Sequence, residues 1–132
     1  MIDAAGSPPH VLIVEDSADT RNVLRYLLQS EGMVVTEAVD GLDALEQLHD
    51  LRARLPPAPS VILLDLMMPR CSGDEFRRKQ LSDPLTADVP VIVISAVPER
   101  RYAFEDLSPF AVMPKPFDLD ELLATIRRAV AA

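Results

Sequence analysis

Residues Val61–Gly73 read VILLDLMMPRCSG, and this stretch carries the strongest fold signal in the chain. Its four leading apolar residues are typical of a strand that is buried on both faces of a parallel sheet. The apolar run stops at Asp65, and the residues from Met67 to Gly73 predict a loop because they include Pro69 and end in glycine. A carboxylate directly after a buried strand indicates a functional position more often than a plain turn.

The sequence on either side of this stretch alternates apolar runs with amphipathic segments. Further strands are predicted at His10–Glu15, Met33–Val39, Val89–Ile94 and Ala111–Met113. Helices are predicted at Arg21–Ser30, around Leu42, Leu45 and Leu48, at Asp74–Leu81 and at Leu119–Val130. Asp16 and Ser17 are expected to supply the cap of the first helix and Gly32 to end it, whereas Asp40-Gly41 is expected to form a turn. A short helix is expected between Pro98 and Leu107.

Strands that alternate with helices predict an α/β fold with a doubly wound parallel sheet. Right-handed crossovers place helices on both faces of such a sheet, which gives a three-layer sandwich. The functional site of this architecture lies at the carboxyl ends of the strands, where the strand order reverses. The chemistry-bearing residues follow that rule, since each ends or follows a predicted strand: Glu15, Asp16, Asp65, Ser95 and Lys115.

Three carboxylates that converge at one sheet edge favour a divalent cation, because like charges so close together cannot all stay ionised without one. Mg²⁺ prefers one or two carboxylates together with water and phosphate oxygens. Asp65 follows the central strand and is the candidate nucleophile, since a carboxylate can accept a phosphoryl group as an acyl phosphate. Lys115 could offset the charge of that group, and the hydroxyl of Ser95 could donate to one of its oxygens.

Composition narrows the function classes. The 132 residues suit one domain, predicted at residues 10–130 after a disordered lead at residues 1–9. The formal net charge of −8 argues against direct binding to nucleic acid or to an anionic membrane. No apolar run is long enough to cross a bilayer. The single cysteine, Cys71, excludes an internal disulfide and fits a reducing cytoplasm.

Four motifs taken together resemble the receiver domain of two-component response regulators. They are VLIVEDS (Val11–Ser17), VILLDLMMPRCSG (Val61–Gly73), VPVIVISA (Val89–Ala96) and KPF (Lys115–Phe117). They occur in the family's order and at similar spacings, and the resemblance covers about residues 10–130. It implies a flavodoxin-like, five-stranded (βα)5 sandwich with strand order 2-1-3-4-5.

The resemblance also implies roles for single residues. Asp65 would be the phosphoacceptor, and Mg²⁺ would be held by Glu15, Asp16, Asp65 and the backbone carbonyl of Met67. Ser95, Ala96 and Lys115 would contact the phosphoryl group, and the bond from Lys115 to Pro116 would be cis. A sensor histidine kinase or a phosphotransfer protein would be the donor. A downstream protein or a second copy of the chain would dock near the last strand and the helices beside it.

The chain departs from the family pattern at several positions. Val112 stands where many receivers carry Tyr or Phe, which puts the coupling of Ser95 to the surface in doubt. Met67 and Val97 are apolar at positions that flank the path of the hydrolytic water in the family. We therefore expect slow autodephosphorylation. Cys71 replaces a residue that is usually apolar, and we expect it to be a loop residue and not a redox sensor.

Other functions remain open from the sequence alone. The chain could be a degenerate receiver that binds a partner constitutively. A phosphatase with Asp65 as nucleophile is the weaker alternative, because Met67 stands where such enzymes carry a second acid. A flavodoxin-type cofactor binder would need a phosphate-cradling loop after the first strand, which is lacking. The basic cluster Arg77–Lys79 is expected to be a solvated helix face.

Overall fold

The computed structural model describes residues 6–66, 72–95 and 107–131. Within these residues a five-stranded parallel sheet has the order β2-β1-β3-β4-β5, which confirms the expected architecture and strand order. Its strands are β1 (His10–Val14), β2 (Val34–Ala38), β3 (Val61–Asp65), β4 (Val91–Ser95) and β5 (Ala111–Pro114). The helices are α1 (Ala18–Ser30), α2 (Gly41–Arg52), α3 (Gly73–Ser82) and α5 (Leu119–Ala131). The helix expected between Pro98 and Leu107 lies outside the described residues, except for Leu107 itself.

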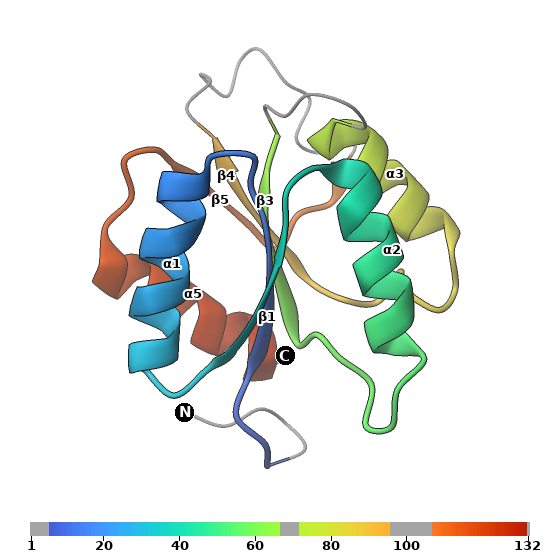
Figure 1. The fold of residues 1–132 in the computed structure, drawn as a ribbon, viewed down its shortest axis with the longest axis horizontal. Helices are drawn as coiled ribbons and strands as arrows, with labels where there is room; N and C mark the ends of the chain where they lie inside the picture. Colours follow the sequence, from blue (N-terminus) through green and yellow to red (C-terminus); the bar gives the residue numbers. More distant parts are fainter. Residues whose placement is uncertain (1–5, 67–71, 96–106, 132) are drawn as a thin grey trace.

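The sheet separates two layers of helices, with α1 and α5 on one face and α2 and α3 on the other (Figure 1). Successive side chains of a strand point to opposite faces, so each central strand contributes to two apolar cores. In β1, Val11 and Ile13 pack with residues of α1 and α5, whereas Leu12 and Val14 pack with residues of α2 and α3. Across the described residues, no helix combines the length and the apolar character that a membrane span requires.

Local sequence chemistry sets the ends of the helices. Of the two expected capping residues, Ser17 caps α1, because its hydroxyl accepts a hydrogen bond from the Thr20 amide. Gly32 follows the end of α1 with a φ of 84°, a left-handed conformation that favours glycine. Asp40 is not part of an isolated turn: its side chain accepts from the Asp43 amide and caps α2, which begins at the next residue.

The expectation of a solvated face at Arg77–Lys79 is wrong for Arg77. The Arg77 side chain is buried and donates to the carbonyl oxygens of Leu107 and Ser108 at 2.7 and 2.9 Å. Arg77 also donates to the side chain of Gln80, at 2.7 Å. These bonds tie α3 to the chain that enters β5. Arg78 and Lys79 are exposed, as expected.

Candidate functional site

The three acids predicted to meet do so at the carboxyl edge of the sheet. Glu15 and Asp16 follow β1, and Asp65 is the last residue of β3. These two strands are neighbours, and the strand order reverses at β1 because β2 pairs with its other side. One carboxylate oxygen from each of Glu15, Asp16 and Asp65 lies within 4.8 Å of the other two. Glu15 and Asp65 are buried, and Asp16 is exposed.

Lys115 brings a positive charge to the two buried acids. Its Nζ lies 3.0 Å from Oε2 of Glu15 and 3.5 Å from Oδ2 of Asp65. The Lys115 amide donates to the Ser95 carbonyl at 3.0 Å, which holds residue 115 beside the end of β4. The peptide bond between Lys115 and Pro116 is cis, as the resemblance implies.

The acids and the ammonium shift one another's protonation. Burial raises the pKa of Glu15 above its ordinary value of 4.5, and the negative charge of Asp65 adds to this increase. The hydrogen bond from Lys115 opposes it without cancelling it. Burial by itself would lower the pKa of Lys115, but the hydrogen bond to Glu15 and the charges of Asp65 and Glu15 together raise it. Lys115 is therefore protonated at neutral pH.

This donor set fits a hard divalent cation. Three carboxylate oxygens at one shallow edge, one of them from an exposed side chain, leave directions open for water and phosphate oxygens. A divalent ion would also add positive charge where the three carboxylates meet. The chemistry of the residues therefore supports the predicted metal site at Glu15, Asp16 and Asp65.

Ser95 is the last residue of β4 and is buried, with Pro114 of β5 beside it in the sheet register. It therefore ends at the same edge as the acids, as predicted from the sequence. Met67, whose carbonyl was expected to ligate the metal, and Ala96, expected to contact the phosphoryl group, lie outside the described residues. The same holds for Cys71 and Val97. Val112 is half-buried in β5 and packs against the core shared with α2 and α3.

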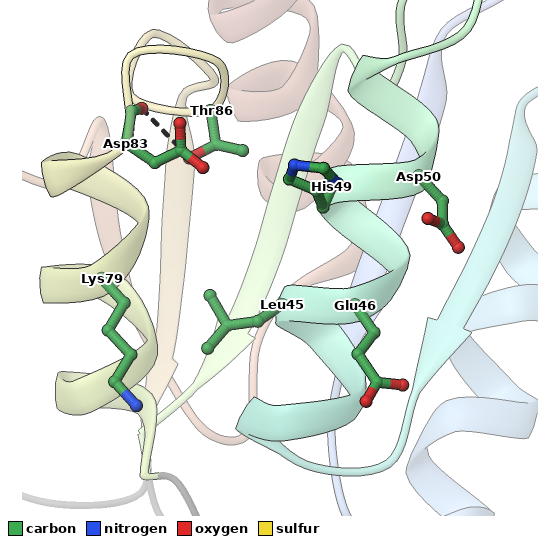
Figure 2. Close-up of a pocket in the computed structure, with 7 residues that line it drawn as sticks. All are labelled: Leu45, Glu46, His49, Asp50, Lys79, Asp83 and Thr86. Carbon is green, nitrogen blue, oxygen red and sulfur yellow. Dashed lines mark hydrogen bonds between the residues drawn. The ribbon is translucent and has the colours of Figure 1, made fainter.

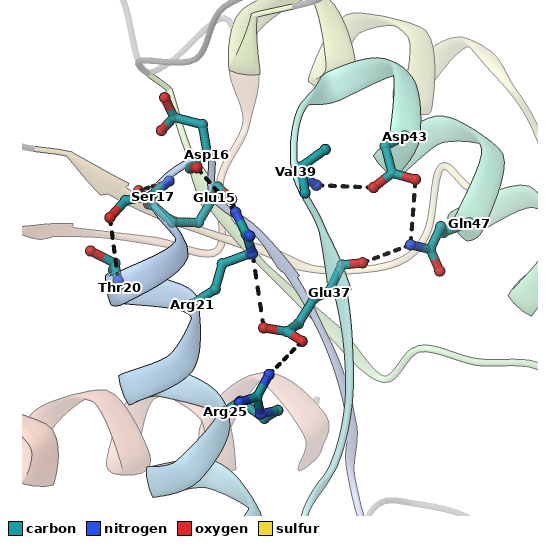
Figure 3. Close-up of polar contacts among 10 residues, drawn as sticks. All are labelled: Glu15, Asp16, Ser17, Thr20, Arg21, Arg25, Glu37, Val39, Asp43 and Gln47. Atoms are coloured by element: carbon teal, nitrogen blue, oxygen red, sulfur yellow. Dashed lines mark hydrogen bonds and ion pairs between the residues drawn. The ribbon is translucent and has the colours of Figure 1, made fainter.

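The sequence reasoning missed two residues that shape this edge. Gly73 begins α3, and a Cβ there would lie 2.6 Å from the Leu66 Cα and 2.8 Å from the Asp65 carbonyl oxygen. Arg21 of α1 donates to the carbonyl oxygens of Glu15 and Asp16 (Figure 3). A helical signal existed for Arg21, because it precedes the buried Leu24 and Leu28 by three and seven residues and so shares their face.

A wider groove, of about 610 Å³, lies away from this edge between α2 and α3 (Figure 2). Its lining mixes both charge signs with one apolar side chain: Leu45, Glu46, His49, Asp50, Lys79, Asp83 and Thr86. Among the described residues, the group whose carboxylates converge as cation ligands is Glu15, Asp16 and Asp65, and none of these lines the groove. The strand-end acids, and not this groove, therefore define the candidate site.

Comparisons with known proteins point to one family. The model of the response regulator receiver domain matches residues 11–127. The chain is 34% identical over 119 residues to the phosphate regulon transcriptional regulatory protein PhoB of Escherichia coli, covering 89% of this chain and 49% of PhoB. It is 36% identical over 122 residues to the response regulator MprA of a Mycobacterium species, covering 91% of this chain and 50% of MprA. The chain thus spans about half the length of these curated relatives.

Solved structures agree with the sequence relatives. The chemotaxis protein CheY4 of Vibrio cholerae superposes with a TM-score of 0.80 at 28% identity, covering 93% of this chain and 99% of that one. A response regulator receiver protein from Pseudomonas putida gives a TM-score of 0.82 at 27% identity, covering 92% of this chain and 98% of that one.

Proposed function

The chain belongs to the receiver domain family of two-component response regulators, and from this we propose that it is switched by phosphorylation of Asp65 in a Mg²⁺-dependent step. The observation that carries the proposal is the meeting of Glu15, Asp16 and Asp65 within 4.8 Å, with the Lys115 ammonium 3.5 Å from Asp65. We take residues 10–130 as the receiver unit. The donor would be a sensor histidine kinase or a phosphotransfer protein acting in the cytoplasm.

The proposed step is an in-line transfer between two carriers. An Asp65 carboxylate oxygen attacks the phosphorus of a phosphohistidine, forming a P–O bond as the P–N bond breaks. The leaving imidazole nitrogen takes up a proton from solvent, so the donor histidine leaves as a neutral imidazole. Lys115 stays protonated and offsets charge on the equatorial phosphoryl oxygens, while the Ser95 hydroxyl donates to one of them. Mg²⁺ held by Glu15, Asp16, Asp65 and the Met67 carbonyl would supply further positive charge at the same oxygens.

The product would act as a switch and not as a turnover enzyme. Phosphorylation adds charge and strong hydrogen-bond acceptors at the ends of β3 and β4. We propose that the surface around β5 and α5 responds to this change. It would bind a downstream protein or a second copy of the chain. We propose no direct contact of this domain with nucleic acid or with a membrane. Because Val112 stands where many receivers carry an aromatic residue, coupling of Ser95 to this surface would need another residue.

Intact-mass spectrometry after incubation with acetyl phosphate and Mg²⁺ tests the proposal. We expect a gain of one phosphoryl group per chain, which chelation of Mg²⁺ and the substitution Asp65→Asn both abolish. Asp40→Asn is the matched control, since Asp40 is another buried carboxylate that follows a strand and asparagine also caps helices well. This variant should be phosphorylated like the parent protein.

The competing functions give different outcomes in the same assay. A constitutive adaptor would take up no phosphoryl group while still binding its partner. An Asp65-dependent phosphatase would release many equivalents of inorganic phosphate per chain. A phosphoryl group found on an acid other than Asp65 would contradict the assignment of the phosphoacceptor.

A further inference from the structure

Arg21 binds the main chain of two of the three acids. The side chain of Arg21 is 16% exposed and runs from the first turns of α1 back to the loop between β1 and α1. Its Nη1 donates to the Glu15 carbonyl at 2.8 Å and to the Asp16 carbonyl at 3.0 Å (Figure 3). One guanidinium nitrogen thus fixes two successive peptide groups.

We propose that Arg21 is a positioning residue for the divalent cation, an inference that rests on the proposed Mg²⁺ site. The direction of each carboxylate depends on the orientation of the peptide groups beside its Cα. Asp16 is exposed, so core packing does not hold it, and the bond from Arg21 to its carbonyl takes that role. Groups that orient metal ligands in this way commonly affect the affinity of the site for its metal.

Arg21 is itself held by β2. Its Nε lies 3.9 Å from Oε1 of Glu37, and the other oxygen of that carboxylate binds Arg25 at 2.9 Å. The carbonyl of Glu37 accepts from the Gln47 side chain at 2.6 Å, which ties this part of β2 to α2. The loop that carries Glu15 and Asp16 is therefore connected, through Arg21 and Glu37, to β2 and α2 as well as to α1. Glu37 also offsets the positive charge of Arg21, which would otherwise repel a cation at the site.

The loss of charge and the loss of positioning at Arg21 would change Mg²⁺ affinity in opposite directions. Removing Arg21 removes a positive charge near the cation, so charge alone would strengthen Mg²⁺ binding. Removing the two hydrogen bonds frees the loop and would weaken binding. A loss of affinity in Arg21→Ala therefore reports positioning and cannot come from the lost charge.

The experiment measures the dissociation constant of Mg²⁺ alone for the full chain and its variants, by calorimetry. We expect Arg21→Ala to bind Mg²⁺ at least about 10-fold more weakly than the parent. Arg25→Ala is the matched control: Arg25 lies one turn further along α1 and shares Glu37, but within the part of the chain that the structure describes it does not donate to the loop carbonyls. Its Mg²⁺ affinity should stay at the parental value. Without Mg²⁺, both variants should have similar urea concentrations at the midpoint of unfolding.

Conservative variants keep the test decisive even if Arg21→Ala folds poorly. Arg21→Lys retains the charge and hydrogen-bond donors and should recover part of the affinity, whereas Arg21→Gln retains polarity without the charge and should bind more weakly than the parent. Amide NMR signals of Asp16 and Ser17 should shift in Arg21→Lys and stay in place in Arg25→Ala. These signals are read without metal and so do not depend on phosphorylation.

Three results would overturn the proposal. Unchanged or tighter Mg²⁺ binding in the Arg21 variants would leave Arg21 a purely structural or electrostatic role. An equal loss in Arg25→Ala would move the effect to Glu37. A parent protein with no Mg²⁺ affinity would refute the metal site of the proposed function, an outcome distinct from a parent that binds and variants that bind equally well.

Discussion

At the scale of single residues, Gly73 sets how closely α3 approaches the end of β3. Its missing side chain allows the Leu66 backbone and the Asp65 carbonyl to lie where a Cβ would clash at 2.6 and 2.8 Å. Both contacts are to backbone, which cannot rotate away as a flexible side chain could. We expect Gly73→Ala to lower the free energy of unfolding by about 1–3 kcal/mol and also to weaken Mg²⁺ binding, because Asp65 must shift.

Gly32→Ala provides the comparison for this variant. Gly32 has a positive φ, but an added Cβ there meets no atom within 4 Å. Its substitution should therefore cost about 1 kcal/mol of stability through backbone strain alone and leave Mg²⁺ affinity unchanged. Urea titrations and calorimetry separate the two effects. Equal metal affinity in the Gly73 variant and the parent would show that β3 does not transmit the clash to Asp65.

The raised pKa of Glu15 predicts that metal binding depends on pH. A protonated Glu15 cannot act as an anionic ligand, and burial followed by the charge of Asp65 raises its pKa above 4.5. Mg²⁺ affinity should therefore fall as the pH falls, beginning at a higher pH than an ordinary glutamate would cause. Calorimetric titrations at a series of pH values test this, and the pH-dependent step that belongs to Glu15 should be missing from Glu15→Gln.

The same pKa shift predicts how stability varies without metal. Because the folded-state pKa of Glu15 is raised, the folded protein holds this proton to a higher pH than the unfolded chain does. The stabilising contribution is fully present below the unfolded value of 4.5 and is lost as the pH rises through the folded value. The difference in unfolding free energy between Glu15→Gln and the parent should therefore grow in favour of the variant as the pH rises through this window. A difference that does not vary with pH would contradict the shift.

At the scale of elements, the link between α3 and the chain entering β5 is a buried polar one. Arg77 donates to two backbone carbonyls and to Gln80, and Gln80 donates to the carbonyls of Thr86 and Val89. Arg77→Met would leave the three acceptors of Arg77 without their donor. We therefore expect a loss of about 2–4 kcal/mol in unfolding free energy. Arg78→Met, on the exposed face of the same helix, should change stability by less than about 0.5 kcal/mol. Urea unfolding measures both, and a small loss at Arg77 would mean that water replaces the guanidinium.

Most elements could be predicted because their signals are local. Strand β3 is a continuous apolar run, and Leu122, Ile126 and Val130 mark the buried stripe of α5 at helical spacing. The positions of Asp65 and Lys115 followed from the rule that parallel strands end at one sheet edge. The roles of Arg77 and Arg21 could not be read in the same way, since a charged residue in a helix suggests solvent until its partner is known. Most of those partners are backbone carbonyl oxygens, which the sequence does not distinguish from one another.

At the scale of the whole molecule, the chain combines an excess of negative charge with a proposed cation site at one edge of the sheet. The chain has a formal net charge of −8, and bound Mg²⁺ would offset the part of it that is concentrated around Glu15 and Asp65. A ligand that binds the folded state alone stabilises it by mass action, by about 2.7 kcal/mol at a hundredfold excess over its dissociation constant. We therefore expect the midpoint temperature of thermal unfolding of the parent protein to rise when Mg²⁺ is added.

Two controls separate specific binding from general screening. Sodium chloride at matched ionic strength should give a much smaller rise, because it screens charges without occupying the site. Asp65→Asn should lose most of the Mg²⁺-dependent rise while its response to sodium chloride stays similar to that of the parent. A rise of equal size with either salt would show that the cation acts on the overall charge and not at the strand ends.

The ion pair between Glu15 and Lys115 joins residues 100 positions apart along the chain. A ribosome that has made the first three strands has already synthesised every carboxylate of the cluster, but not the Lys115 ammonium. Truncated products that end before β5 would therefore carry the acids without their partner. The contact that pairs Glu15 with an ammonium can therefore form only once the chain has been made through residue 115.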